Sequence, residues 1–168
     1  MPNTFTLINS VVVGSGGSSA FDFTSIPSTF SDLCVKFSTR STVNSGTYTA
    51  YNVSLNGGGD LTSKYVFGTG SGVGSGTETS FITGWSPTSA NTTNVFGVSE
   101  LYIPRYASSY IKTIQLDGGG ENNASGTLNF FVAGRWASTS AINRVTITDL
   151  SGNFVQHSAA YLYGIKNA

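Results

Sequence analysis

A chain of 168 residues has the size of one globular domain and is long enough to bury a hydrophobic core. Hydrophobic residues make up 39% of it and aromatic residues 12%, contents that exclude a disordered chain. Only 10% of the residues are charged, and the eight basic and eight acidic side chains cancel and are scattered along the sequence. Proteins that neutralise nucleic-acid phosphates need clustered Lys and Arg, so this pattern argues against nucleic acid as a partner.

The start of the chain and its one cysteine bear on where the protein is made. No basic segment followed by an apolar run opens the sequence, so a secretory signal is not predicted. No stretch approaches the roughly 20 apolar residues of a membrane span, so membrane insertion is not predicted either. Cys34 stands between Leu33 and Val35 and has no second cysteine to pair with, which predicts a buried core thiol. We therefore expect synthesis in a reducing cytoplasm.

Short alternating or β-branched runs recur from one end of the chain to the other, and no helical period interrupts them. The alternation is clearest at Leu33, Val35 and Phe37, between which polar side chains point to the opposite face. The pattern predicts strands over residues 4–13, 20–23, 32–39, 47–55, 64–67, 79–83, 94–103, 111–117, 126–135, 144–148 and 159–165.

Glycine-rich segments separate these runs. Those at residues 14–17, 56–60, 118–120 and 151–153 are predicted to be turns. The longest, residues 68–77, alternates Gly with Ser and Thr and is predicted to be a flexible surface loop inside the domain. The sequence thus predicts one all-β domain over residues 1–168, a single antiparallel β-sandwich that is jelly-roll-like, and a closed barrel fits the same strand pattern.

Few residues are suited to catalysis or to metal binding. His157 is the single histidine, and a nucleophilic triad needs a base with an orienting partner, so we expect an exposed or hydrogen-bonded structural histidine. Zinc needs a cluster of Cys and His that the composition lacks. Asp117 and Glu121 flank a glycine run and are weak calcium candidates, for which an ordinary glycine turn is the stronger interpretation. No cofactor is predicted, and no pair of acids can be assigned to glycoside hydrolysis.

Aromatic side chains are the more serious candidates for contact with a glycan or another protein, because their flat faces stack on both. The candidates are Trp85, Tyr102, Tyr106, Tyr110 and Trp136. Trp136 follows the predicted strand over residues 126–135 and is expected to close the core. Trp85 and Tyr106 lie near turn residues and are expected to be exposed.

Three parts of the chain resemble a known group of proteins. These are residues 23–33, which contain Ile26-Pro27-Ser28-Thr29-Phe30, residues 131–136 with 141–147, and the ending over 152–154 and 163–166. They resemble small β-sandwich virion proteins and fibre domains of tailed bacteriophages, especially those of marine bacteria and cyanobacteria. The resemblance implies a non-enzymatic structural protein located in the virion, as a capsid (head) decoration or fibre protein. The alternative is a tail-fibre receptor-binding module that recognises a host surface glycan.

The resemblance implies fold and role but no ligand residue. Met1 leads directly into a predicted strand without a separate anchoring segment, so we expect a small stand-alone subunit. A net charge of zero provides little self-repulsion and favours assembly. The expected partners are other virion proteins of the capsid or tail, further copies in a homo-oligomer and, for the alternative, a host surface glycan.

Overall fold

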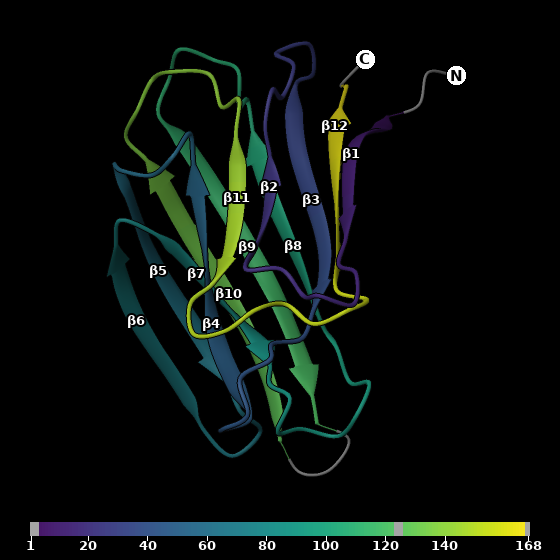
Figure 1. Ribbon diagram of the computed structural model, residues 1–168. Coiled ribbons are helices and arrows are strands. Elements are labelled where there is room, and N and C mark those ends of the chain that lie inside the picture. The colour runs from purple at the N-terminus through teal and green to yellow at the C-terminus, as the bar shows by residue number, and fades with distance from the viewer. Residues whose placement is uncertain (1–3, 123–125, 167–168) are drawn as a thin grey trace.

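The computed structural model describes residues 4–122 and 126–166, which form strands with turns and bends between them and no helix (Figure 1). The strands are β1 (Phe5–Val12), β2 (Ala20–Phe23), β3 (Asp32–Thr39), β4 (Tyr48–Leu55), β5 (Leu61–Gly68), β6 (Val73–Thr79), β7 (Ile82–Pro87), β8 (Gly97–Pro104), β9 (Lys112–Glu121), β10 (Thr127–Trp136), β11 (Val145–Asp149) and β12 (Ala159–Ile165).

These strands build two antiparallel sheets packed on each other. The large sheet has the order β1-β12-β3-β8-β9-β10-β5-β6, and the small sheet has the order β2-β11-β4-β7. The small sheet crosses in front of β9 and β10 in Figure 1, and β7 contacts β9 directly. The prediction of an all-β antiparallel sandwich is confirmed, and two separate open sheets exclude the closed barrel. The jelly-roll connection stays a prediction.

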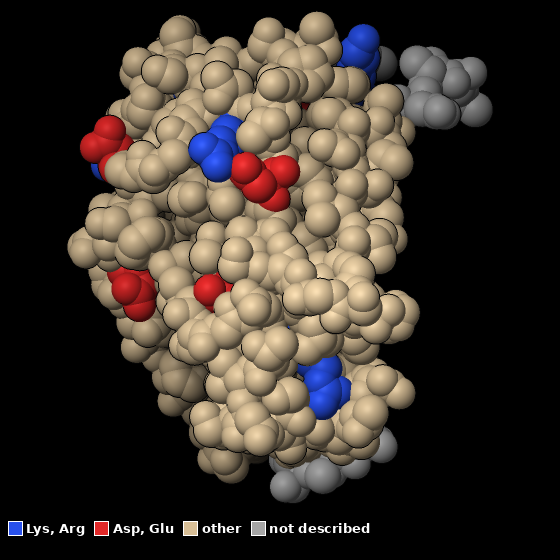
Figure 2. Space-filling model, in the orientation of Figure 1, with Lys and Arg blue, Asp and Glu red and all other residues tan. Residues whose placement is uncertain are grey.

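The core lies between the sheets, and strands such as β8, β10 and β11 alternate side chains that face it with side chains that face away. Strand β10 shows this over its whole length, since every second residue from Leu128 to Trp136 is buried. Strand β3 alternates as predicted, with Leu33, Val35 and Phe37 facing the core. The side of the small sheet that faces away from the core is sparsely charged. Figure 2 shows a few acidic and basic side chains on this largely uncharged surface.

The flexible loop predicted over residues 68–77 is wrong. This segment contains the end of β5, a short turn and most of β6. Gly74 pairs across the strands with Phe67, and Gly76 pairs with Tyr65. A Cβ atom on these glycines would lie 2.5 Å from the Phe67 ring and 2.3 Å from the Tyr65 hydroxyl. The glycines are therefore the places where two aromatic rings cover the neighbouring strand, and not signs of flexibility.

The turn predicted at residues 118–120 is also wrong, because these three glycines lie inside β9. Gly118 pairs with Phe130, and a Cβ there would lie 2.7 Å from that ring. By contrast, the turn at residues 56–60 is confirmed: Asn56 and Asp60 both have positive φ, as do the glycines between them.

Two buried cations hold the loops at the ends of the sandwich. The guanidinium of Arg40 donates to the carbonyls of Thr92 at 2.7 Å and Asn91 at 3.1 Å. The ammonium of Lys112 donates to the Ser108 carbonyl at 2.7 Å and lies 5.2 Å from the centre of the Trp136 ring. Burial lowers the pKa of Lys112. These hydrogen bonds hold the loops that contain Asn91, Thr92 and Ser108 against the sandwich.

Candidate functional site

The outer face of the large sheet is the face turned away from the small sheet, and it carries unusually large exposed side chains. On β10 the alternation that buries Phe130 and Val132 necessarily turns Phe131 and Ala133 outwards. Val66 on β5 and Val98 on β8 are exposed on the same face, and Val73 on β6 is 93% exposed. A monomeric protein normally scatters such residues singly, so this face is the candidate site.

Phe131 lies near the middle of this surface and is 60% exposed. In the register of the sheet it stands opposite Asp117 of β9 on one side and Val66 of β5 on the other. Its diagonal neighbours include Gly119 and Gly68, which both pair with Asn129 two residues before it. None of these neighbours covers the ring, which is why it stays largely exposed.

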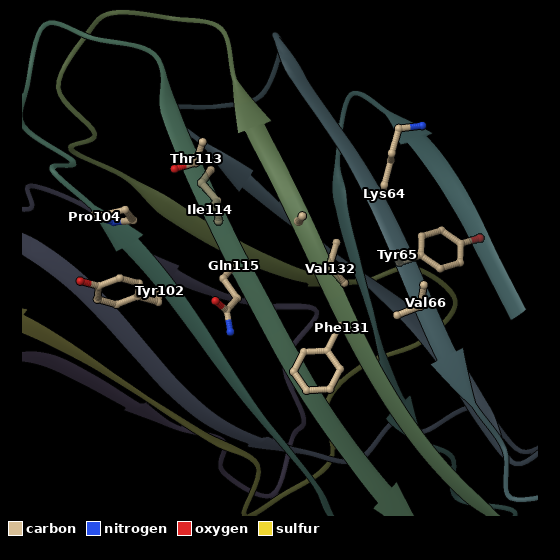
Figure 3. A pocket seen from close by; sticks show the side chains of 11 residues that line it. Lys64, Tyr65, Val66, Tyr102, Pro104, Thr113, Ile114, Gln115, Phe131 and Val132 are labelled. Carbon is tan, nitrogen blue, oxygen red and sulfur yellow. The ribbon is translucent and has the colours of Figure 1, made fainter. Parts of the chain in front are cut away.

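A groove of about 650 Å³ opens beside Phe131, across β8, β9, β10 and β5. Tyr102 and Pro104 bound it on the β8 side, while Lys64 and Val66 bound it on the β5 side. Figure 3 shows the Phe131 ring broadside in this groove, next to Gln115, with Tyr102 beyond β9. The ring thus presents its face, and not its edge, to the space above the sheet.

Two further hollows meet at the same ring. One of about 680 Å³ is bounded by Val98, Asp117 and Asn129 and has the glycines of β9 as its floor. The other, of about 450 Å³, lies between Val66 and Val73. Phe131 lines all three depressions, so it is the shared element of the surface.

Polar groups stand around the ring in fixed positions. Gln115 Nε2 donates to Asp117 Oδ1 at 3.4 Å. The Tyr102 hydroxyl donates to Asp32 Oδ2 at 2.7 Å, which orients the tyrosine ring at the groove wall. This hydrogen bond to the carboxylate, helped by partial burial, raises the pKa of Tyr102. Asp32 also accepts the Arg105 backbone N–H at 2.9 Å, which anchors the contact.

An ion pair divides the outer face into two parts. Along one cross-strand row, Phe131 is followed by Asp117, Glu100, Lys36 and Tyr161. Lys36 Nζ lies 2.8 Å from Glu100 Oε2, and this contact raises the pKa of Lys36. Beyond it, at the β1 edge, lies a second exposed group, the β1 patch, formed by Phe5, Leu7, Val12 and Tyr161.

Of the five aromatic candidates, only Tyr102 lines the groove beside Phe131. Tyr110 is 69% exposed but lies in the turn before β9, outside the groove lining. Trp136 is 3% exposed, so the prediction that it closes the core is confirmed.

The expected exposure of Trp85 and Tyr106 is wrong. Tyr106 is fully buried, because Arg105 has a positive φ of 51° and turns the chain inwards, and the Tyr106 hydroxyl donates to the Pro27 carbonyl. Trp85 is half-buried between the sheets, with ring centres 5.1 Å from Tyr65 and 5.2 Å from Phe130. Both rings belong to the interior and not to a contact surface.

The two calcium candidates lie on one extended strand instead of a turn. Asp117 and Glu121 are both in β9, and four residues along a strand span about 13 Å. One ion cannot be ligated by both side chains at that separation. Among residues 4–122 and 126–166, no three His, Cys, Asp or Glu side chains gather as a metal site would need.

The predicted states of Cys34 and His157 are confirmed. Cys34 is buried on β3, and burial, with a smaller effect of Glu100, raises the pKa of its thiol to about 12. A thiol with this pKa is protonated and unreactive at neutral pH. His157 is exposed in a turn, where its φ is 74°.

Phe131 was missed by the sequence reasoning, although a signal was present. In the pair Phe130-Phe131 a strand must turn one ring inwards and one outwards, and Leu128 and Val132 assign the inward side to Phe130.

No protein-family model, curated protein or solved structure matches this chain. Within the described residues, no helix has the length and apolar character to cross a membrane.

Proposed function

We propose that this chain is a non-enzymatic structural protein of a tailed-phage particle, a head decoration or fibre subunit. The observation that carries the proposal is the outer face of the large sheet, where exposed apolar residues form the Phe131 groove and the β1 patch. Contiguous exposed apolar surface is typical of proteins that work in contact with others. The resemblance of residues 23–33 and 131–136 to phage virion proteins supports the same role.

Strand β1 favours assembly from several copies. It is an edge strand of the large sheet, and no charged residue occurs between Thr4 and Val13. Proteins that remain monomeric usually protect such an edge with charges or proline. A bulge between Leu7 and Asn9 interrupts the ladder, so residues 9–12 form the regular stretch on which the same stretch of a second copy can pair. Self-association through this edge is part of the proposal.

The placement of two carboxylates on the outer face favours the non-enzymatic role. Glu100 and Asp117 stand opposite each other on β8 and β9 and both point outwards from one flat sheet. A glycosidase places its two acids on either side of the scissile bond, and one of them must carry a proton. Glu100 is instead held by Lys36 at 2.8 Å.

The test is to image purified phage particles by cryo-electron microscopy. We expect density for this sandwich at a regular copy number on the head or tail, and particles that lack the protein contradict the proposal.

Self-association is tested by sedimentation equilibrium of the isolated chain. Val12→Lys, in the β1 patch and within the regular stretch of residues 9–12, is expected to weaken association about tenfold or more, because it places a charge in an uncharged edge. Val73→Lys, at the opposite edge of the sheet, is the matched control and is expected to associate like the wild type.

A further inference from the structure

We infer that the Phe131 groove is a binding site for a neutral saccharide, with one pyranose ring stacked on the exposed face of Phe131. The inference deepens the proposed function, since it rests on the outer face of the large sheet being a contact surface, and it names the ligand of one part of that face.

The first step is the shape of the surface. A pyranose presents C–H groups on one face and hydroxyls around its rim, so it needs a flat aromatic platform with open space on both sides. Phe131 lies broadside in the groove (Figure 3), and hollows of about 650 and 680 Å³ flank it. Each volume is within the range of small-ligand sites. Ala133 and Gly119 keep the neighbouring positions low, so sugars next to the stacked ring meet no obstruction.

The second step is the set of polar groups at the rim. Gln115, Asp117 and Asn129 bring planar amide and carboxylate groups next to the ring, from β9 and from β10 itself. The amides donate and accept hydrogen bonds and the carboxylate accepts them through two oxygens, which suits vicinal hydroxyls. Because all three belong to central strands of the sheet, their backbones are fixed before a ligand arrives.

The third step is charge. Among the described residues that line the 650 Å³ groove, Lys64 is the cationic one, and the carboxylates of Asp117 and Glu121 line the hollow on the other side of Phe131. Recognition of sulfate, phosphate or several carboxylates uses clustered Arg or Lys. This surface has one cation and two carboxylates and no cluster of Arg or Lys, so it suits uncharged sugars better than anionic ones. A protein partner would use the same apolar area, but it would not require a flat ring.

Affinity electrophoresis of the full chain tests the inference. The probes are native gels containing a neutral β-glucan (laminarin), a neutral galactomannan or the anionic polysaccharide alginate. We expect retardation by a neutral polymer and little by alginate. Phe131→Leu keeps apolar area but removes the flat face, and it is expected to raise the dissociation constant about tenfold or more. Phe131→Trp keeps the face and is expected to bind at least as tightly as the wild type.

Tyr110→Leu is the matched control, since it removes an exposed aromatic ring that lies outside the groove and outside the β1 patch. It is expected to bind like the wild type, and thermal unfolding checks that each variant is folded. The inference is overturned if Phe131→Leu binds as well as the wild type, if neutral gels never retard the chain, or if alginate binds best. It is also overturned if Phe131→Leu releases the chain from particles, since the occupant is then a protein.

The proposed function is tested by a different measurement, the incorporation of the chain into particles. Incorporation of the chain and of both Phe131 variants into particles is unaffected by the loss of a saccharide site. Conversely, release of reducing ends from a neutral polymer would contradict a non-enzymatic role while supporting the saccharide site.

Discussion

Glycine has an unexpected role in this protein. Four cross-strand pairs place a glycine opposite a large aromatic ring: Gly74 with Phe67, Gly76 with Tyr65, Gly84 with Tyr51, and Gly118 with Phe130. In each pair the ring occupies the volume that a side chain on the partner would need. Part of the high glycine content is therefore a packing requirement of the sheets.

Gly84 gives the sharpest test of this requirement. Its Cβ would lie 2.3 Å from Tyr51 Cζ, and Tyr51 is fully buried, with its hydroxyl donating to Ser99 at 2.8 Å. Because the ring cannot move away, Gly84→Ala is expected to lower the free energy of unfolding by about 2 kcal/mol or more. A Cβ atom on Gly72 would have no atom within 4 Å, so Gly72→Ala is expected to change the free energy of unfolding by less than about 0.5 kcal/mol. Urea unfolding measures this free energy for both variants. Equal losses in the two variants would contradict the packing role of Gly84.

At the scale of single residues, sequence reasoning succeeded where local chemistry decides the outcome. Cys34 between apolar neighbours and Trp136 at a strand end were assigned to the interior correctly. Tyr106 was misassigned because the backbone turn at Arg105 and a carbonyl 79 residues away, at Pro27, decide its burial. Phe131 was predictable from alternation, but the groove around it depends on four strands that are not all adjacent in the sequence.

At the scale of elements, the pairing of β2 with β11 carries a pH-dependent contact. Arg144 donates to Asp22 through Nε at 2.8 Å and a terminal nitrogen at 2.9 Å, and Thr146 of β11 also donates to Asp22. The hydrogen bonds from Arg144 lower the pKa of Asp22, against the opposing effect of partial burial. Ionised Asp22 therefore stabilises the fold above its ordinary pKa near 4, and the contribution is lost as the pH falls through the lowered value.

Asp22→Asn is expected to lower the melting temperature by about 2 °C or less at pH 7, because the pair is largely exposed. The difference from the wild type should vanish near pH 2, where the native carboxyl is protonated too. Thermal unfolding followed at both pH values measures it. A difference that persists at pH 2 would show that Asp22 acts through something other than its charge.

The elements that the sequence predicted well are those whose pattern is complete within one strand. The bounds of β3 were predicted from the alternation at Leu33, Val35 and Phe37, and they match the structure. Strand β6 and the end of β9 were missed because their glycines read locally as turns. What makes them strands is the aromatic ring on the adjacent strand, and that pairing is absent from any local pattern.

At the scale of the whole molecule, the sandwich places its two exposed apolar regions in separate parts of one sheet face. The β1 patch lies at one edge, the Phe131 groove lies towards the other, and the Lys36–Glu100 ion pair stands between them. A subunit with this arrangement can be held by its edge while the groove stays open to ligand. The alternating strand pattern predicted the fold class, whereas this division of the surface depends on the order of the strands.

The pairing of β1 with β12 also decides how the molecule responds to mechanical load. The strands are antiparallel, with Phe5 opposite Ile165, and the Lys166 N–H donates to the Thr4 carbonyl at 3.1 Å. Tension between Thr4 and Lys166 would peel β1 away one hydrogen bond at a time, whereas tension between Gly14 and Lys166 would load the bonds of β12 in shear. Optical-tweezer measurements with handles at these two pairs should give a lower rupture force for the first, and equal forces would contradict this. Attachment points, as much as stability, would then determine whether such a subunit survives strain.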